Sequence, residues 1–138
     1  MSPKEVMDNL NGLIPGSKYF RWSEALYLSR VQAFALPNDE QIANIITLAR
    51  ALDKVREHYG RPVRVTSWLR PQAYNQLIGG AMKSQHMLGR AVDFVIEGVP
   101  SHKVHEELEK RKDIWPYRGE KGITWVHLDL NPGNWFYP

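Results

Sequence analysis

The stretch SQHMLGRAVD, residues 84–93, decides how this chain is organised. Its glycine permits a tight turn, so that a histidine on a loop and an aspartate on the following strand can reach one point. A further histidine lies in the stretch WVHLD, residues 125–129. Two imidazoles and a carboxylate suit a single zinc ion that keeps one coordination position open. The sequence therefore predicts that His86, Asp93 and His127 bind Zn2+, and an open zinc ion predicts a hydrolase.

The position of Asp93 supports the metal interpretation. It lies between Val92 and Phe94 in an apolar run. An ionised carboxylate buried there without a partner would destabilise the fold, and a bound cation removes that penalty. The alternative is structural, because a lone histidine can be an ordinary polar residue and an aspartate in a strand can simply be hydrogen-bonded. We favour the metal site because three residues of ligand type occur in patterns that can bring them together.

Length and composition predict one compact globular domain over residues 1–138. The chain has 43% hydrophobic and 24% charged residues, which is enough for a core but leaves little length for a second module. It has no cysteine, so disulfides and thiolate zinc sites are excluded, and any zinc ligands must be nitrogen or oxygen atoms.

Charge and hydropathy narrow the setting in which the protein works. The net charge is +3 without a basic tract, so we do not expect nucleic-acid binding, although this charge would favour approach to an anionic polymer such as a cell wall. Residues 1–12 lack the apolar core of a signal peptide, and no apolar run is long enough to cross a membrane. We therefore expect a protein that is synthesised in the cytoplasm without a signal peptide and has no membrane partner.

The pattern of apolar residues predicts an α+β fold. The expected elements are a long helix over 39–58, strands over 63–67, 91–96 and 123–130, a short helix or turn over 71–77, and a charged helix capped by Ser101 that runs to about Lys112. Alternation along the strands places Asp93 on one face of a sheet, and places Trp125, His127 and Asp129 together on one face. The other face is apolar. We expect a small antiparallel sheet that carries the metal site on one face and packs helices on the other.

The remaining histidines and aromatic residues have structural interpretations. His102 and His105 are three residues apart and could bind a metal, but they lie in a Lys/Glu-rich helix without a third ligand, so we expect a solvated face. His58 would complement the dipole at the end of the long helix. Trp125 shares the metal face and could form a wall of the groove, whereas the aromatic residues at 135–137 are expected to close the core over the sheet.

The same residues resemble a known family. The pattern Ser-x-His-x-x-Gly-x-Ala-x-Asp over 84–93, followed by Val-His-Leu-Asp over 126–129, is similar to the zinc D-alanyl-D-alanine carboxypeptidase family, which includes vancomycin-resistance dipeptidases and phage endolysins. The resemblance extends to YFRWSE at 19–24 and VTSWLR at 65–70, and it covers most of residues 19–130. It implies the small α+β fold of the hedgehog signalling domain, a zinc cofactor and a peptidoglycan stem peptide as the substrate.

The resemblance also implies roles for individual side chains. Arg70 matches the family's arginine that binds the substrate carbonyl and the developing oxyanion, a role that suits a permanently charged planar donor. Without the resemblance, a surface salt bridge would be the simpler interpretation of Arg70. Ser84 and Gln85 could bind the substrate or orient His86, and Ser84 could equally cap its loop.

The pattern does not assign the general base. Active members of the family place Glu or His three residues before the last zinc ligand, and Thr124 occupies that position here. Asp129 could be the base or could hold His127 in place, and we prefer the second role. Glu120, in a segment expected to be flexible, could move over the metal when the substrate binds, and Glu97 is a weaker candidate.

These observations together predict a monomeric zinc peptidase that cuts peptidoglycan stem peptides, as a D,D- or L,D-type carboxypeptidase or endopeptidase. We expect an endolysin or a virion-associated lysin that acts at the bacterial cell wall, with a cytoplasmic recycling enzyme as a second possibility. The rival from another class is a non-catalytic, zinc-stabilised binding module that uses the same groove, and Thr124 is the main argument for it. A base within reach of the zinc-bound water distinguishes the two.

Overall fold

The structure, a computed structural model, describes residues 1–138 and has an α+β architecture. Its helices are α1 (Pro3–Met7), α2 (Trp22–Leu26), α3 (Asp39–Tyr59), α4 (Gln72–Leu77), the 3-10 turn η1 (Gln85–Leu88) and α5 (Ser101–Lys110), and its strands are β1 (Tyr27–Leu28), β2 (Ala33–Phe34), β3 (Val63–Ser67), β4 (Ala91–Ile96), β5 (Arg118–Glu120) and β6 (Val126–Asp129). All strand pairs are antiparallel, in one two-stranded and one four-stranded sheet. The predicted α+β class is confirmed.

The larger sheet brings three candidate side chains into one row. Its strand order is β3-β4-β6-β5, and its register pairs Asp93 with His127 and His127 with Glu120. Residues that are directly paired across antiparallel strands project to the same face, with Cβ atoms about 5 Å apart. The side chains of Asp93, His127 and Glu120 therefore lie side by side on one face of this sheet.

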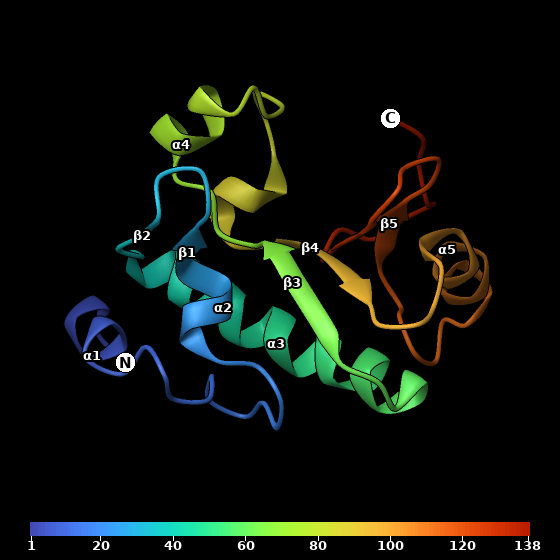
Figure 1. The fold of residues 1–138 in the computed structure, drawn as a ribbon, viewed down its shortest axis with the longest axis horizontal. Helices are drawn as coiled ribbons and strands as arrows, with labels where there is room; N and C mark the ends of the chain where they lie inside the picture. Colours follow the sequence, from blue (N-terminus) through green and yellow to red (C-terminus); the bar gives the residue numbers. More distant parts are fainter.

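Helix α3 covers the opposite face of the sheet. It begins at a capping box, in which Asn38 Oδ1 accepts from the backbone N–H of Gln41 while Gln41 Oε1 accepts from the backbone N–H of Asn38. It ends at Gly60, whose φ of 62° is left-handed and favours glycine. Figure 1 shows α3 running behind β3, with α1 at one end of the molecule and α5 and β5 at the other.

The core lies between α3 and the sheet. On the sheet side it contains the residues that alternate with the candidate ligands, and on the helix side the apolar stripe of α3: Val92, Phe94, Val126 and Leu128 with Ile42, Ile45, Leu48 and Leu52. Each of these side chains is at most 3% exposed. The strand alternation predicted from the sequence is therefore confirmed. No helix of the fold combines the length and the apolar character needed to span a lipid bilayer.

The structure corrects three expectations about the helices and strands. The last strand is shorter than the predicted 123–130, because pairing with β4 begins only at Val126. The segment 118–122, which we expected to be flexible, contains the edge strand β5. Ser101 is the first residue of α5 and not its cap, since Pro100 precedes it at the N-cap without a side-chain hydrogen bond.

Leucine truncation should separate the core from the surface. Leu52 is fully buried in α3, whereas Leu36 is 68% exposed. Leu52→Ala should lower the free energy of unfolding by about 2–5 kcal/mol, because it leaves a cavity among packed side chains. Leu36→Ala should change it by less than about 0.5 kcal/mol. Urea denaturation of both variants tests this, and equal effects would contradict the assigned core.

Candidate metal centre

His86 is held in place by a short turn that α3 anchors. Ser84 caps η1, and its Oγ accepts from the backbone N–H of His86 at 3.2 Å. From α3, the side-chain amides of Gln41 and Asn44 donate to backbone carbonyls of the turn at 2.9 and 2.8 Å. The long helix therefore fixes the height of His86 above the sheet, and the predicted capping role of Ser84 is present.

Gly89 ends this turn in a conformation that only glycine adopts easily. Its φ is 74°, in the left-handed region. A Cβ atom at this position would lie 3.0 Å from Ile45 Cγ1 and 3.1 Å from the Gln41 carbonyl oxygen. Glycine thus permits both the reversal of the chain and its close approach to α3, which brings His86 over Asp93.

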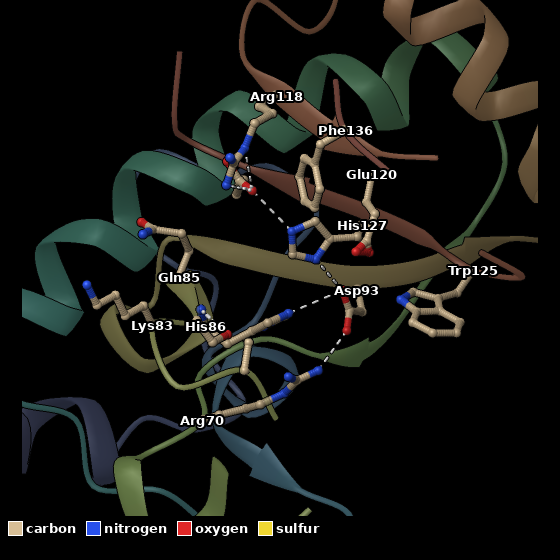
Figure 2. A pocket seen from close by; sticks show the side chains of 13 residues that line it. Arg70, Lys83, Gln85, His86, Asp93, Arg118, Glu120, Trp125, His127 and Phe136 are labelled. Carbon is tan, nitrogen blue, oxygen red and sulfur yellow. Dashed lines mark hydrogen bonds and ion pairs between the residues drawn. The ribbon is translucent and has the colours of Figure 1, made fainter. Parts of the chain in front are cut away.

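The side chains of the three predicted ligands converge on one point (Figure 2). Asp93 Oδ1 lies 2.8 Å from His127 Nδ1 and 3.2 Å from His86 Nε2, and one ligand atom from each residue lies within 4.8 Å of the others. Tetrahedral zinc with bonds of about 2.0–2.2 Å separates its ligand atoms by roughly 3.3 Å. Small side-chain movements would therefore suffice to bind the ion.

The second nitrogen of each histidine is already engaged. His86 Nδ1 donates to the carbonyl oxygen of Trp68 at 2.7 Å. His127 Nε2 lies 3.1 Å from Oδ2 of Asp129. A carbonyl oxygen and an ionised carboxylate only accept, so a neutral ring uses its one hydrogen atom there. The nitrogens that face Asp93 are then the unprotonated ones, which is the tautomer that binds a metal.

With both rings neutral, three acceptor atoms would face one another where His86, Asp93 and His127 meet, so a proton or a metal ion stabilises this arrangement. Burial alone would lower the pKa of His127, but hydrogen bonds with Asp129 and Asp93 outweigh it and raise the pKa to about 9. Burial alone would raise the pKa of Asp93, but hydrogen bonds from His127 and His86 hold that pKa well below its usual range. A proton is thus strongly held at this point, and a divalent metal ion in its place would bind all three atoms, Asp93 Oδ1, His86 Nε2 and His127 Nδ1. The donor set fits zinc.

Arg70 lies against the outer oxygen of Asp93. Its Nη2 donates to Asp93 Oδ2 at 2.8 Å, and its Nε donates to Ser67 Oγ at 2.8 Å. The side chain lines the cavity and is 16% exposed, and its Nη1 donates no hydrogen bond within the chain. The structure therefore brings Arg70 to the site with one donor group free.

A cavity of about 320 Å³ lies over the candidate ligands. The three residues that the sequence suggested for substrate binding, Ser84, Gln85 and Trp125, all line it. In Figure 2, Gln85 lies on the opposite side of the candidate ligands from Glu120 and Trp125. Trp125 is 40% exposed and forms part of the wall. The other lining residues are Arg70, Ala81, Lys83, His86, Asp93, Arg118, Glu120, His127, Asp129 and Phe136.

The two candidate bases differ in their surroundings. Asp129 is fully buried, and its carboxylate accepts from Nε and Nη2 of Arg118 and from the backbone N–H of Asn131, besides facing His127. Burial alone would raise the pKa of Asp129, but hydrogen bonds with His127 and Arg118 lower it. Glu120 lines the cavity, and its carboxylate has no hydrogen bond or ion pair within the chain. Only Glu120 has free oxygen atoms.

Two other polar residues lie away from the cavity. Thr124, in the position of the family's base, is exposed and does not line the cavity. Glu97, at the end of β4, is also exposed and outside the lining. The structure therefore does not bring either residue to the candidate ligands.

The other histidines required one correction. His102 is exposed, as expected, but His105 is only 4% exposed, and its Nε2 donates to the carbonyl oxygen of Trp125 at 2.8 Å. The prediction of a solvated face is wrong for His105, because the inner face of α5 packs on β5 and β6. At the end of α3, the ring of His58 contacts the carboxylate of Glu107 on α5.

The C-terminal aromatic residues divide between core and site. Trp135 is 7% exposed and joins the core, as predicted, whereas Tyr137 is 69% exposed and does not. Phe136 lines the cavity, and the sequence analysis missed this role. It also missed Arg118 and Lys83 as cavity residues. Strand pairing by the tail is a long-range contact, and no local pattern predicts it.

Removal of either candidate histidine should abolish metal binding. The wild-type protein is expected to retain one zinc per chain after dialysis, and His86→Ala and His127→Ala should retain almost none, because two ligands form a weak site. His102→Ala, on the exposed face of α5, should bind as the wild type does. Elemental analysis gives the stoichiometry and circular dichroism checks the fold. A His127→Ala variant with a full equivalent of zinc would contradict the assignment.

One protein family matches the part of the chain that contains this candidate site. The sequence model of the family described as Peptidase M15 matches residues 20–129, which include all three candidate ligands, Arg70 and both candidate bases. No curated protein matches the chain at a significant level. The family match extends over well more than half of the chain. The chain belongs to the Peptidase M15 family.

Proposed function

We propose that this protein is a zinc peptidase that hydrolyses stem peptides of bacterial peptidoglycan. The observation that carries the proposal is the convergence of His86 Nε2, Asp93 Oδ1 and His127 Nδ1 beneath a cavity, with the other nitrogen of each imidazole already bound to an acceptor. This geometry favours a bound cation, and membership of the Peptidase M15 family supports a peptidase. The cleaved bond would be of the D,D- or L,D-type, at the end of the stem peptide or within it.

The chain's own residues would hold and orient the metal. A zinc ion bound by His86, Asp93 and His127 would polarise the scissile carbonyl and lower the pKa of a water molecule towards roughly 7. The carbonyl of Trp68 and the carboxylate of Asp129 keep the two imidazoles in the ligating tautomer. Asp129 would therefore act on His127 and would not receive the substrate's proton.

Arg70 would bind the substrate carbonyl oxygen. Its Nε and Nη2 are fixed by Ser67 and Asp93, so the guanidinium plane is set before the substrate arrives. Arg70 lines the cavity and its Nη1 has no partner within the chain, so this group would be available to donate to the oxygen that becomes negatively charged as the carbonyl is attacked. Arg70 is permanently charged, so this stabilisation does not depend on pH.

Glu120 would be the general base. Its register opposite His127 places it beside the candidate ligands, and it has no competing partner. It would take a proton from the attacking water while the water oxygen bonds to the carbonyl carbon. The C–N bond then breaks, and Glu120 returns the proton to the leaving amine, so the products are a carboxylic acid and an amine.

The remaining cavity residues would contact the peptide. Trp125 offers an exposed aromatic wall on the side of Glu120, and Gln85 lies on the other side of the ligands (Figure 2). Ser84 also lines the cavity. A monomer acting as an endolysin or a virion-associated lysin is the setting that we favour, and the net charge of +3 would favour approach to an anionic cell wall.

Digestion of purified peptidoglycan and its soluble muropeptides tests the proposed reaction directly. The zinc-loaded protein should release new fragments, identified by mass spectrometry, while a chelated sample and the His127→Ala variant should release none. The mass of the fragments would name the bond that is cut. A folded protein that holds one zinc per chain and releases no fragment would instead support the non-catalytic binding module.

Two amide variants distinguish the roles of the acids. Glu120→Gln should keep its zinc and lose at least about 100-fold in kcat, because the amide cannot accept a proton. Asp129→Asn should bind zinc about 10- to 100-fold more weakly, since the support of His127 is lost. Zinc titration and kinetics with excess zinc separate the two effects. A Glu120→Gln variant of wild-type activity would rule out Glu120 as the base.

A further inference from the structure

The C-terminal tail completes the wall of the candidate metal centre. The backbone N–H of Phe136 donates to the carbonyl of Gly119 at 3.1 Å, and the N–H of Lys121 donates to the carbonyl of Phe136 at 2.7 Å. This parallel pairing beside Glu120 attaches the tail to the outer edge of β5. The Phe136 ring thereby enters the cavity next to His127 (Figure 2).

Four side chains contact one another in a cycle that includes the outer nitrogen of His127. They are His127, Asp129, Arg118 and Phe136. His127 Nε2 faces Asp129 Oδ2 at 3.1 Å, and Asp129 accepts from Arg118 Nε at 3.2 Å and from Arg118 Nη2 at 3.0 Å. The Arg118 guanidinium carbon lies 4.3 Å from the centre of the Phe136 ring. The Phe136 ring meets the His127 ring edge to face, with centroids 6.0 Å apart and an interplanar angle of 81°.

We infer that Arg118 and Phe136 are positioning residues that orient His127 for metal binding through Asp129. The inference rests on the proposed metal site. It adds to that site two residues that are not among the candidate ligands. Phe136 lies outside residues 20–129, so the family match does not extend to it.

Each of these four contacts restricts a movement of the His127 side chain or of a residue that holds it. A histidine ring on a strand can turn about its side-chain bonds and present either nitrogen. Asp129 selects Nδ1 for the metal by accepting from Nε2. Arg118 fixes the plane of that carboxylate, because its Nε donates to Oδ1 and its Nη2 donates to Oδ2. The Arg118 side chain is itself 29% exposed, and the face of Phe136 restricts its movement into solvent.

Two conservative variants and one matched control test the inference. Phe136→Leu keeps an apolar side chain but removes the ring, and Arg118→Lys keeps the charge but loses the two-point hydrogen bond. Tyr137→Leu is the control, because the neighbouring ring is 69% exposed and contacts Lys121 instead of His127. Arg118→Ala is avoided, since it would leave the buried carboxylate of Asp129 without its cation.

The readouts report on the metal and not on activity. Zinc affinity is measured by competition with a chromophoric chelator, the absorption spectrum of the Co2+-loaded protein reports the coordination geometry, and thermal unfolding of the metal-free protein reports the fold. Both variants should bind zinc at least about tenfold more weakly and show an altered Co2+ spectrum, with Tyr137→Leu unchanged. Loss of thermal stability alone would mean a purely structural role.

Wild-type zinc affinity and an unaltered Co2+ spectrum in both variants would overturn the inference. If Arg118→Lys does not fold, Phe136→Leu decides the question by itself. These measurements need no substrate, so a wild-type protein that binds zinc but cleaves no stem peptide would contradict the proposed function alone.

Discussion

The cross-strand pairing of Asp93 with His127 is the constraint on which the candidate site depends. Directly opposed residues on β4 and β6 share a face, and their side chains meet at 2.8 Å. The same register leaves Val92, Phe94, Val126 and Leu128 for the core, so a slip of one residue would bury the ligands and expose the apolar side chains. Hydrophobic packing against α3 therefore holds the ligand geometry in place.

Each buried aspartate of the site is paired with an arginine. Two arginine–aspartate pairs flank the point where the ligands meet, with Arg70 on Asp93 and Arg118 on Asp129. Breaking a buried pair leaves an uncompensated charge, so each pair constrains its aspartate strongly. The two pairs act on different residues. Arg70 holds the candidate ligand Asp93, and Arg118 holds Asp129, which in turn orients the candidate ligand His127. Glu120 remains the carboxylate of the cavity without a partner.

Much of this arrangement could be predicted from the sequence, because it depends on local patterns. Alternation within 91–96 located β4 and the face of Asp93, and the helical spacing between Asn38 and Gly60 located α3. The glycine at position 89 indicated the turn that returns His86 to the sheet. Periodicity, caps and turn residues act over a few positions, and a single sequence displays them directly.

The parts that escaped prediction depend on contacts between distant segments. β5 is only three residues long, and its pairing with β6 and with the tail at Phe136 leaves no periodic pattern in 118–122. His105 is buried because α5 packs over β6, where the carbonyl of Trp125 accepts its hydrogen atom. The Lys/Glu-rich composition of α5 suggested that His105 lies on a solvated face, whereas the fold buries it with a hydrogen-bond partner.

A crystal structure of the zinc-loaded protein with anomalous data at the zinc edge tests most directly whether a metal ion occupies the meeting point of the three ligands. We expect one anomalous peak about 2.0–2.2 Å from His86 Nε2, from an oxygen of Asp93 and from His127 Nδ1. His127 Nε2 should still face Asp129 in that structure. The metal site, on which the proposed peptidase activity depends, would be contradicted by a peak elsewhere. It would also be contradicted if zinc-soaked crystals showed no peak while these side chains kept their positions.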